Sequence, residues 1–244
     1  MSDLKKIWLN MLDWIYCDGN NINKDGVEVR EILGTCQFID NSFNDISYIS
    51  YSPELFIESI KNGAFDIEDY PIKGEFLADY VASIDDKDVI NLKRDFVYSY
   101  PERLEAIATP YSDSAEIGYV NQLDVIKERL IKCPESNRAI ASLYIPGIDK
   151  DREDIPCLNH LQAFIRQNEL YLFCLFRSND IYGAFPSNML FLQYIGLRLT
   201  NDLQEKYPTL KFKGISYRAN SAHFYKTDED AVKQVLINNN LSLR

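Results

Sequence analysis

Hydrophobic residues recur at helical spacing in six stretches of the chain. Apolar positions three and four residues apart predict helices over residues 2–16, 53–61, 75–84, 117–132, 188–201 and 228–237. Pro53 at a first turn and Asn62-Gly63 after a last turn mark the ends of the second helix. Residues 188–201 are apolar on nearly every side, which predicts a central, buried helix.

Short runs rich in β-branched and aromatic residues predict the strands. They cover residues 27–38, 139–144, 161–166, 170–177, 211–218 and 222–225. Gly34 indicates a bulge in the first strand, and residues 167–169 form a turn between the third and fourth. Because no repeat, low-complexity tract or linker interrupts this order, we expect one α+β domain over residues 1–244, with helices flanking a large sheet.

The charge of the chain narrows the classes of ligand. The 244 residues carry a formal net charge of −11. A protein that binds nucleic acid generally presents a basic face, so we expect no nucleic-acid partner. A small phosphate ligand needs only a few well-placed cations, which an acidic protein can still supply.

The cysteines favour a reducing compartment. They are odd in number and show neither a CxxC pair nor zinc spacing: Cys17, Cys36, Cys133, Cys157 and Cys174. With only two histidines besides, we expect no metal site. The chain shows neither a leader-like start nor an apolar run long enough for a membrane span, so we expect a cytoplasmic protein without a membrane partner.

Reactive side chains concentrate in residues 155–159, 177–188 and 222–225. A free cysteine such as Cys157, between apolar stretches, is more often an inert core residue than a nucleophile. A reactive thiol needs a nearby cation. Arg177 ends the strand that follows Cys157, so antiparallel pairing of adjacent strands would bring the two together.

The other candidates also allow two interpretations. Arg177-Ser178 can clamp a phosphate or be an exposed strand end. Asn188 can cap the helix that it opens, or its amide can pair with the edge of a base. His223 and Tyr225 share one face of a strand, where they can bind a sugar hydroxyl or form a satisfied core pair.

Together, the three segments resemble the thymidylate synthase family, which includes the pyrimidine nucleotide hydroxymethylases. The motifs occur in the family's order: Pro156-Cys157, Gln162, Arg177-Ser178-x-Asp180, Pro186 with Asn188, and His223-x-Tyr225. The 20 positions from Cys157 to Arg177 are the family's spacing. The N-terminal half resembles the family more loosely, at Asp25-Gly26 through Leu33-Gly34, Pro53-Glu54-Leu55 and Pro134-Glu135-Ser136-Asn137-Arg138.

The resemblance implies a fold, a reaction and a set of roles. In the family, a cysteine thiolate adds to C6 of a pyrimidine so that C5 can attack methylenetetrahydrofolate. Cys157 would be the nucleophile, and Glu54 the buried carboxyl that moves protons through water. The remaining roles would be Arg177 (thiol activation and phosphate), Ser178 (phosphate), Tyr100 or its rival Tyr98 (C5 deprotonation), Asp180 (folate), Asn188 (base), and His223 with Tyr225 (sugar).

The resemblance also implies a homodimer that pairs sheet against sheet and shares its active sites. In the family, two adjacent cations reach the phosphate bound by the partner subunit. Asn137-Arg138 occupies that place, so one cation is missing, and Lys24 replaces another phosphate-binding arginine. Lysine cannot reproduce the bidentate geometry of arginine, so the sugar-phosphate preference stays open between ribose and deoxyribose.

Other departures bear on the product. Leu158 stands where synthases carry a histidine, the family glycine is displaced to Gly183, and the only tryptophans are Trp8 and Trp14. With the short C-terminus, these features indicate a wetter pocket, which favours hydroxymethylation. Asn188 instead indicates uracil, and short archaeal synthases share several of these departures, so reductive methylation is the alternative. A silent nucleotide-binding homologue is a third.

Overall fold

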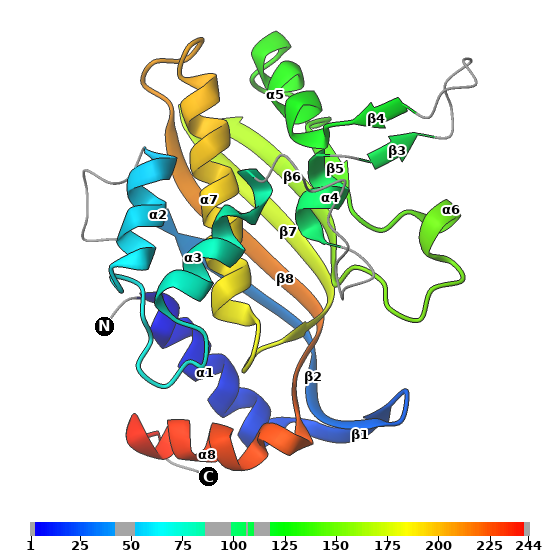
Figure 1. The fold of residues 1–244 in the computed structure, drawn as a ribbon, viewed down its shortest axis with the longest axis vertical. Helices are drawn as coiled ribbons and strands as arrows, with labels where there is room; N and C mark the ends of the chain where they lie inside the picture. Colours follow the sequence, from blue (N-terminus) through cyan, green and yellow to red (C-terminus); the bar gives the residue numbers. More distant parts are fainter. Residues whose placement is uncertain (1–2, 42–51, 86–98, 106, 110–117, 242–244) are drawn as a thin grey trace.

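A six-stranded sheet is the centre of the computed structural model, which describes residues 3–41, 52–85, 99–105, 107–109 and 118–241 (Figure 1). The strand order is β1-β2-β8-β7-β6-β5. β7 and β8 pair in parallel, and the other neighbours are antiparallel. The strands are β1 (Asn20–Lys24), β2 (Val27–Asp40), β5 (Ile140–Ser142), β6 (Leu158–Arg166), β7 (Glu169–Asp180) and β8 (Lys211–Tyr225).

Helices flank this sheet, and a small second sheet pairs β3 (Ile107–Thr109) with β4 (Gly118–Val120). In Figure 1, α7 crosses the face of the sheet, with α1, α2 and α3 beside it. The described helices are α1 (Asp3–Asp18), α2 (Pro53–Lys61), α3 (Gly74–Ala82), α4 (Tyr100–Glu105), α5 (Gln122–Lys132), α6 (Pro146–Asp149), α7 (Phe185–Leu203) and α8 (Glu229–Asn238), with 3₁₀ turns η2 (Ser83–Asp85) and η3 (Lys226–Asp228). The expected α+β architecture, a mixed sheet with flanking helices, is confirmed.

The predicted central helix is buried nearly throughout. Pro186 occupies its first turn, and almost every side chain of α7 is buried, as its apolar sequence predicts. Gly196 allows α7 to approach the sheet closely, because a Cβ there would lie 2.3 Å from the Phe212 ring. α7 is also the crossover that a parallel β7–β8 pair requires.

The turn between β6 and β7 sets the register of the site. Gln167 and Asn168 both have positive φ, 51° and 63°, which gives a tight hairpin turn. The ladder above it pairs Leu158 with Phe176. One step further, the Arg177 backbone N–H donates to the Cys157 carbonyl at 2.8 Å. The predicted strands and turn therefore do place Cys157 beside Arg177.

Two of the expected element bounds were wrong, and one strand of the large sheet was missed. The helix expected from residue 117 begins at Gln122, because the Asn121 side chain caps it by accepting from the N–H groups of Leu123 and Asp124. Gly118–Val120 is instead strand β4. The two strands expected over residues 211–218 and 222–225 form one continuous strand, β8, and β1 was not predicted. Within the described ranges, none of the helices is both long and apolar enough to cross a membrane.

One face of the sheet exposes large apolar side chains. Phe38 of β2 and Phe173 of β7 both pair with Ser216 of β8 and so share this face, and they are 46% and 42% exposed. Neighbours of opposite parity, such as Leu172 and Cys174, are buried beneath the helices. The chain therefore presents an apolar sheet surface to its surroundings.

Candidate active site

A cavity of about 770 Å³ lies where the ends of β7 and β8 and the segment just before β6 meet α7. It is large enough for a nucleotide together with part of a second ligand. Most of the side chains selected from the sequence line it: Lys24, Tyr100, Cys157, Ser178, Asp180, Asn188, His223 and Tyr225.

The Ser178 hydroxyl joins the thiol to two cations. Its Oγ lies 3.8 Å from Cys157 Sγ, and it accepts from Lys24 Nζ at 3.5 Å and Arg177 Nη1 at 3.3 Å. Ser178 itself is buried. Two positive charges and a hydroxyl thus converge beside the thiol, an arrangement that suits a dianionic group such as a phosphate.

The Arg177 guanidinium is oriented by the segment that leads to the thiol. Nη2 donates to the Ile155 carbonyl at 2.7 Å, and Nε donates to the Pro156 carbonyl at 3.2 Å. These bonds, with the backbone bond to Cys157, connect the arginine to three consecutive residues. The cation and the thiol are therefore positioned as one unit.

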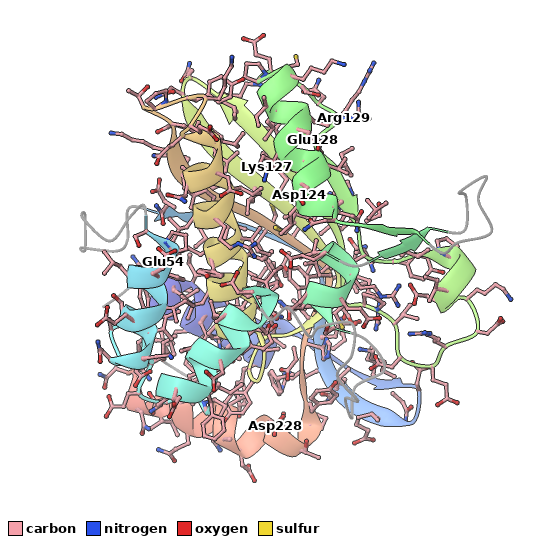
Figure 2. The ribbon with its side chains drawn as sticks, turned by 45° about the horizontal axis from the view of Figure 1, so that its top comes forward. Glu54, Asp124, Lys127, Glu128, Arg129 and Asp228 are labelled. Carbon is pink, nitrogen blue, oxygen red and sulfur yellow. The ribbon has the colours of Figure 1, made fainter. Side chains whose placement is uncertain are left out.

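Asp180 ends β7, and its carboxyl has a raised pKa. Its Oδ1 accepts from the backbone N–H groups of Tyr182 and Gly183, both at 3.0 Å. Burial raises the pKa of Asp180 to about 6, against the lowering effect of these bonds, and the charge of Asp228 at the start of α8 adds to the rise (Figure 2). This carboxyl can therefore exchange a proton near neutral pH.

His223 pairs with Asp180 across the parallel β7–β8 ladder and is 2% exposed. Burial, with the charges of Lys24 and Arg177, lowers the pKa of His223 to about 4, so the ring is neutral at pH 7. Ser221 donates to Glu31, and its Oγ lies 3.5 Å from His223 Nδ1. Because the Ser221 hydrogen is used on Glu31, Nδ1 carries the proton.

The proton on Nδ1 leaves His223 Nε2 as an acceptor. Among the described residues, no hydrogen-bond partner reaches this buried atom. The ring of Tyr225 lies 5.5 Å away, perpendicular to His223, and both residues line the cavity. A ligand hydroxyl that donates to Nε2 would satisfy the histidine.

Asn188 does not cap the helix, contrary to one of its two interpretations. Ala184 is the N-cap residue of α7, and Asn188 lies one turn further in. Its Nδ2 donates to Asn179 Oδ1 at 3.1 Å, and its Oδ1 accepts from the Tyr80 hydroxyl at 2.6 Å. The amide is thus oriented at the cavity wall by side chains from two other elements.

The structure describes one of the two candidate tyrosines. The Tyr100 hydroxyl accepts from the backbone N–H of Leu158 at 3.3 Å, directly after the thiol, and Tyr100 lines the cavity. Its rival Tyr98 lies outside the described residues. Sequence reasoning missed Tyr80, Asn179 and Phe191, which also line the cavity. Asn179 lies inside the Arg177–Asp180 motif, which was a signal for it.

Three candidates are not among the residues that line the cavity: Arg177, which bonds to the lining residue Ser178, and Glu54 and Arg138. Figure 2 shows Glu54 at the start of α2, where its side chain is exposed. The Ser52 hydroxyl donates to Glu54 at 2.7 Å and holds the pKa of Glu54 below its ordinary value. Arg138 is also exposed, just before β5. The roles of Glu54 and Arg138 stay predictions.

Metal-binding side chains do not gather in the part of the chain that the structure describes. No group of three or more His, Cys, Asp or Glu residues there could hold a metal ion. The chemistry that this cavity displays is that of a thiol, an ammonium, an amide and a buried carboxyl, with the Arg177 guanidinium bonded to Ser178 in its wall.

Comparison with known proteins agrees with this geometry. The family model described as thymidylate synthase matches residues 83–243. A putative thymidylate synthase of Methanothermobacter marburgensis is 28% identical over 239 residues, which are 98% of this chain and 97% of that protein. One from Methanocaldococcus jannaschii is 32% identical over 173 residues, 68% of this chain and 71% of that protein. The chain therefore belongs to the thymidylate synthase family.

Proposed function

We propose that this chain transfers a one-carbon unit from methylenetetrahydrofolate to C5 of a pyrimidine nucleoside 5′-monophosphate. Members of this family bind a pyrimidine nucleotide and use this folate as cosubstrate. The observation that carries the proposal is the position of Cys157, in one cavity with Asn188 and beside Ser178, whose hydroxyl accepts from Lys24 and from the Arg177 guanidinium. Covalent catalysis divides a difficult substitution at C5 into easier steps.

The proposed steps conserve atoms and charge. The Cys157 thiolate forms a bond to C6, and the displaced electron pair makes C5 nucleophilic. C5 then bonds to the methylene carbon as a folate nitrogen leaves with the electron pair of its broken bond. Loss of the C5 proton to a base then expels the second folate nitrogen and leaves an exocyclic methylene at C5. Water, giving a hydroxymethyl group, or a hydride from the tetrahydrofolate, giving a methyl group and dihydrofolate, adds to that methylene, and the electron pair returned to the ring restores the C5–C6 double bond as the sulfur leaves as a thiolate.

The cavity suggests how the nucleotide is held. Arg177, Ser178 and Lys24 would bind the phosphate, and His223 Nε2 with Tyr225 would bind a sugar hydroxyl. Asn188 would pair with the base. Asp180, with its raised pKa, would bind the folate ring system, whose nitrogens can share a proton with a carboxyl.

We propose hydroxymethylation as the product, from the departures at Leu158 and Gly183 and the absence of tryptophan from the cavity lining that the structure describes. Water would then supply the hydroxyl. Reductive methylation is the second candidate, favoured by a specific observation. Tyr80, Tyr100 and Phe191 line the cavity with aromatic rings that can exclude water, and the relatives are named putative thymidylate synthases.

We also propose that the chain is a single domain that works in the cytoplasm as a homodimer. The exposed apolar side chains on one sheet face, Phe38 and Phe173, would be buried against a second copy. In that dimer, Arg138 would reach the phosphate bound by the partner. This accounts for a cation that lies outside the cavity of its own chain.

Two assays test the reaction. Protein with methylenetetrahydrofolate and C5-tritiated uridine, deoxyuridine, cytidine or deoxycytidine monophosphate is expected to release tritium, and Cys157→Ser to release none. Mass analysis of the product distinguishes a hydroxymethyl from a methyl group and identifies the base and the sugar. Retained release in Cys157→Ser would contradict the nucleophile. Nucleotide binding without turnover on any of the four would support a silent homologue instead.

Mixed dimers test the shared site. Cys157→Ser and Arg138→Ala are each expected to be inactive or nearly so as separate homodimers. A mixed dimer has one site with both native residues, so mixing after mild dissociation is expected to restore activity. Mixing Cys157→Ser with Arg166→Ala is the control. Absence of restoration, with mixed dimers demonstrated by mass spectrometry, would remove Arg138 from the site.

A further inference from the structure

The turn that connects β7 to α7 is held by side chains of two segments far away in the sequence. The Trp8 indole of α1 donates to the Ile181 carbonyl at 2.7 Å, and the Tyr70 hydroxyl donates to the Gly183 carbonyl at 2.9 Å. Trp8 and Tyr70 are not among the residues that line the cavity. They contact the turn from its other side.

Both donors are buried and belong to one aromatic cluster. Trp8 is 0% exposed and Tyr70 is 2% exposed. The Trp8 ring meets Tyr70 edge to face at a centroid distance of 5.8 Å and stacks on Tyr182 at 6.4 Å. Burial raises the pKa of Tyr70 to about 12, so its hydroxyl keeps the proton that it donates. Packing of this kind fixes the directions of the two donors.

The bond from Trp8 determines where the next backbone N–H points. The Ile181 carbonyl and the Tyr182 N–H belong to one planar peptide unit, in which the two groups point in opposite directions. Trp8 binds the carbonyl side of this unit, and its N–H side donates to Asp180 Oδ1 at 3.0 Å. The indole and the carboxyl are therefore the two ends of one hydrogen-bonded relay, in which each bond polarises the other.

Tyr70 acts on the turn in the same way two peptide units later. The Gly183 carbonyl that it binds shares a peptide unit with the Ala184 N–H, which donates to the backbone carbonyl of Asp180 at 3.1 Å. The Gly183 N–H itself donates to Asp180 Oδ1 at 3.0 Å. Two side chains outside the cavity thus orient the backbone groups that hold Asp180 by its carboxyl and by its main chain.

We propose that Trp8 and Tyr70 are positioning residues for the cosubstrate, because they hold this turn so that Asp180 presents one carboxyl oxygen to the folate ring system. This inference rests on the proposed function, since it takes Asp180 as the residue that binds folate. Two N–H groups of the turn occupy Oδ1, so the ligand would bind through Oδ2. Trp8 would then serve the site through the backbone, from outside the cavity.

Loss of the indole donor should be felt at the carboxyl. The peptide unit that Trp8 binds could then rotate, and the bond from the Tyr182 N–H to Asp180 would weaken. A weaker donor stabilises the ionised carboxyl less, so the pKa of Asp180 should rise further above its ordinary value. The other titratable groups near this carboxyl stay the same when Trp8 is altered: Lys24 of β1, His223 and Tyr225 of β8, and Asp228 before α8.

An isosteric tryptophan analogue tests the indole donor alone. Benzothienylalanine carries sulfur in place of the indole N–H and keeps the shape of the ring system. It replaces Trp8 alone when a tryptophan-auxotrophic host expresses the Trp14→Phe protein, because the chain has two tryptophans. Trp14→Phe, at a 42% exposed position of α1, should itself match the unmodified protein.

Two constants and one pH profile are measured in this protein. Relative to Trp14→Phe, we expect the KM for methylenetetrahydrofolate in the tritium-release assay to rise about fivefold or more. The calorimetric Kd of the nucleotide should stay within twofold. The midpoint of the pH dependence of the folate KM should move to higher pH, because the carboxyl loses part of its hydrogen bonding.

Tyr70→Phe tests the second donor. It removes one buried hydroxyl, which also lies 2.9 Å from Ser187 Oγ, and should raise the folate KM by about threefold or more. Tyr207→Phe is the matched control, because this hydroxyl donates to the Leu130 and Ile131 carbonyls at the end of α5, away from the cavity. It should leave the folate KM unchanged.

The outcomes separate the positioning role from the proposed function. A folate KM within twofold of its reference in the benzothienylalanine protein or in Tyr70→Phe would overturn the role of the residue concerned. Equal weakening of folate and nucleotide, or a raised KM for the Trp8 replacement without a shift of the pH midpoint, would also overturn it. If the unmodified protein releases no tritium from any pyrimidine monophosphate, the proposed function fails, and this inference with it.

Discussion

Arg177 and Cys157 are neighbours across the β6–β7 ladder, where the Arg177 N–H donates to the Cys157 carbonyl at 2.8 Å. The guanidinium of the same arginine turns back along the chain to the carbonyls of Ile155 and Pro156. Main chain and side chain therefore both connect the cation to the segment that carries the thiol. A rigid connection of this kind is what an enzyme needs to keep a nucleophile and its phosphate anchor at a constant separation.

Arg177→Lys tests this connection. Lysine keeps the charge, but a single ammonium cannot reach two carbonyls and the Ser178 hydroxyl in the geometry of the planar guanidinium. We expect kcat/KM for tritium release to fall by about 100-fold or more. Arg166→Lys at the end of β6, whose guanidinium bonds to Ile165 and Asn137, is the matched control. Activity within threefold of the unmodified protein would contradict the role of the guanidinium.

Asp180 and His223 should shift the pH dependence of the unfolding free energy in opposite directions. The pKa of Asp180 is raised from 3.8 to about 6, so its contribution is fully present below pH 3.8 and is lost as the pH rises through 6. Asp180→Asn removes this residue's contribution to the unfolding free energy, which otherwise grows as the pH falls. We therefore expect the variant to lose about 2 kcal/mol more unfolding free energy between pH 7 and pH 4 than the unmodified protein. Urea unfolding at both pH values measures it.

His223→Gln should change the loss of unfolding free energy between pH 7 and pH 4 in the opposite direction from Asp180→Asn. The pKa of His223 is lowered from 6.5 to about 4, so its contribution is present above pH 6.5 and is lost as the pH falls through 4. Without the histidine, the loss of unfolding free energy between pH 7 and pH 4 should shrink by about 2 kcal/mol. Equal pH dependence in both variants would mean that neither group titrates as its surroundings indicate.

Strand periodicity and motif order predicted most of the residues that line the site, but they did not predict the contacts that support those residues. The tight turn at Gln167 and Asn168 let the positions of Cys157 and Arg177 be predicted, because a hairpin register depends on local geometry. Tyr80 lies 108 positions from Asn188, and their hydrogen bond arises only when α3 packs against α7. Such a contact has no local signature.

A buried ion pair outside the cavity gives a prediction about folding. Arg103 Nη2 lies 2.5 Å from Asp149 Oδ1, and the two side chains are 3% and 0% exposed. In the described part of the chain, Arg103 Nε and Nη1 lack hydrogen-bond partners, so Asp149 supplies the compensation that this guanidinium has. Asp149→Asn should therefore cost about 3–5 kcal/mol of unfolding free energy in urea. Asp151→Asn, in an exposed pair with Lys150, should have little effect.

Gly183→Ala should separate folate binding from nucleotide binding. An added Cβ would lie 2.5 Å from Asp180 Oδ2, so the carboxyl must turn away and weaken its bonds to the N–H groups of Tyr182 and Gly183. Because a side-chain end can move, we expect the fold to survive. The KM for methylenetetrahydrofolate should rise about tenfold, while the calorimetric Kd of the nucleotide stays within twofold.

The control for this substitution is Gly147→Ala on α6, where a Cβ would meet nothing within 4 Å. It should leave both constants unchanged. If Gly183→Ala instead weakened nucleotide binding and left the folate KM unchanged, Asp180 would belong to the nucleotide's part of the cavity. Because Asp180 and His223 are paired in the β7–β8 register, this result would place both residues at the nucleotide. The ratio of the two constants therefore locates the folate within the cavity.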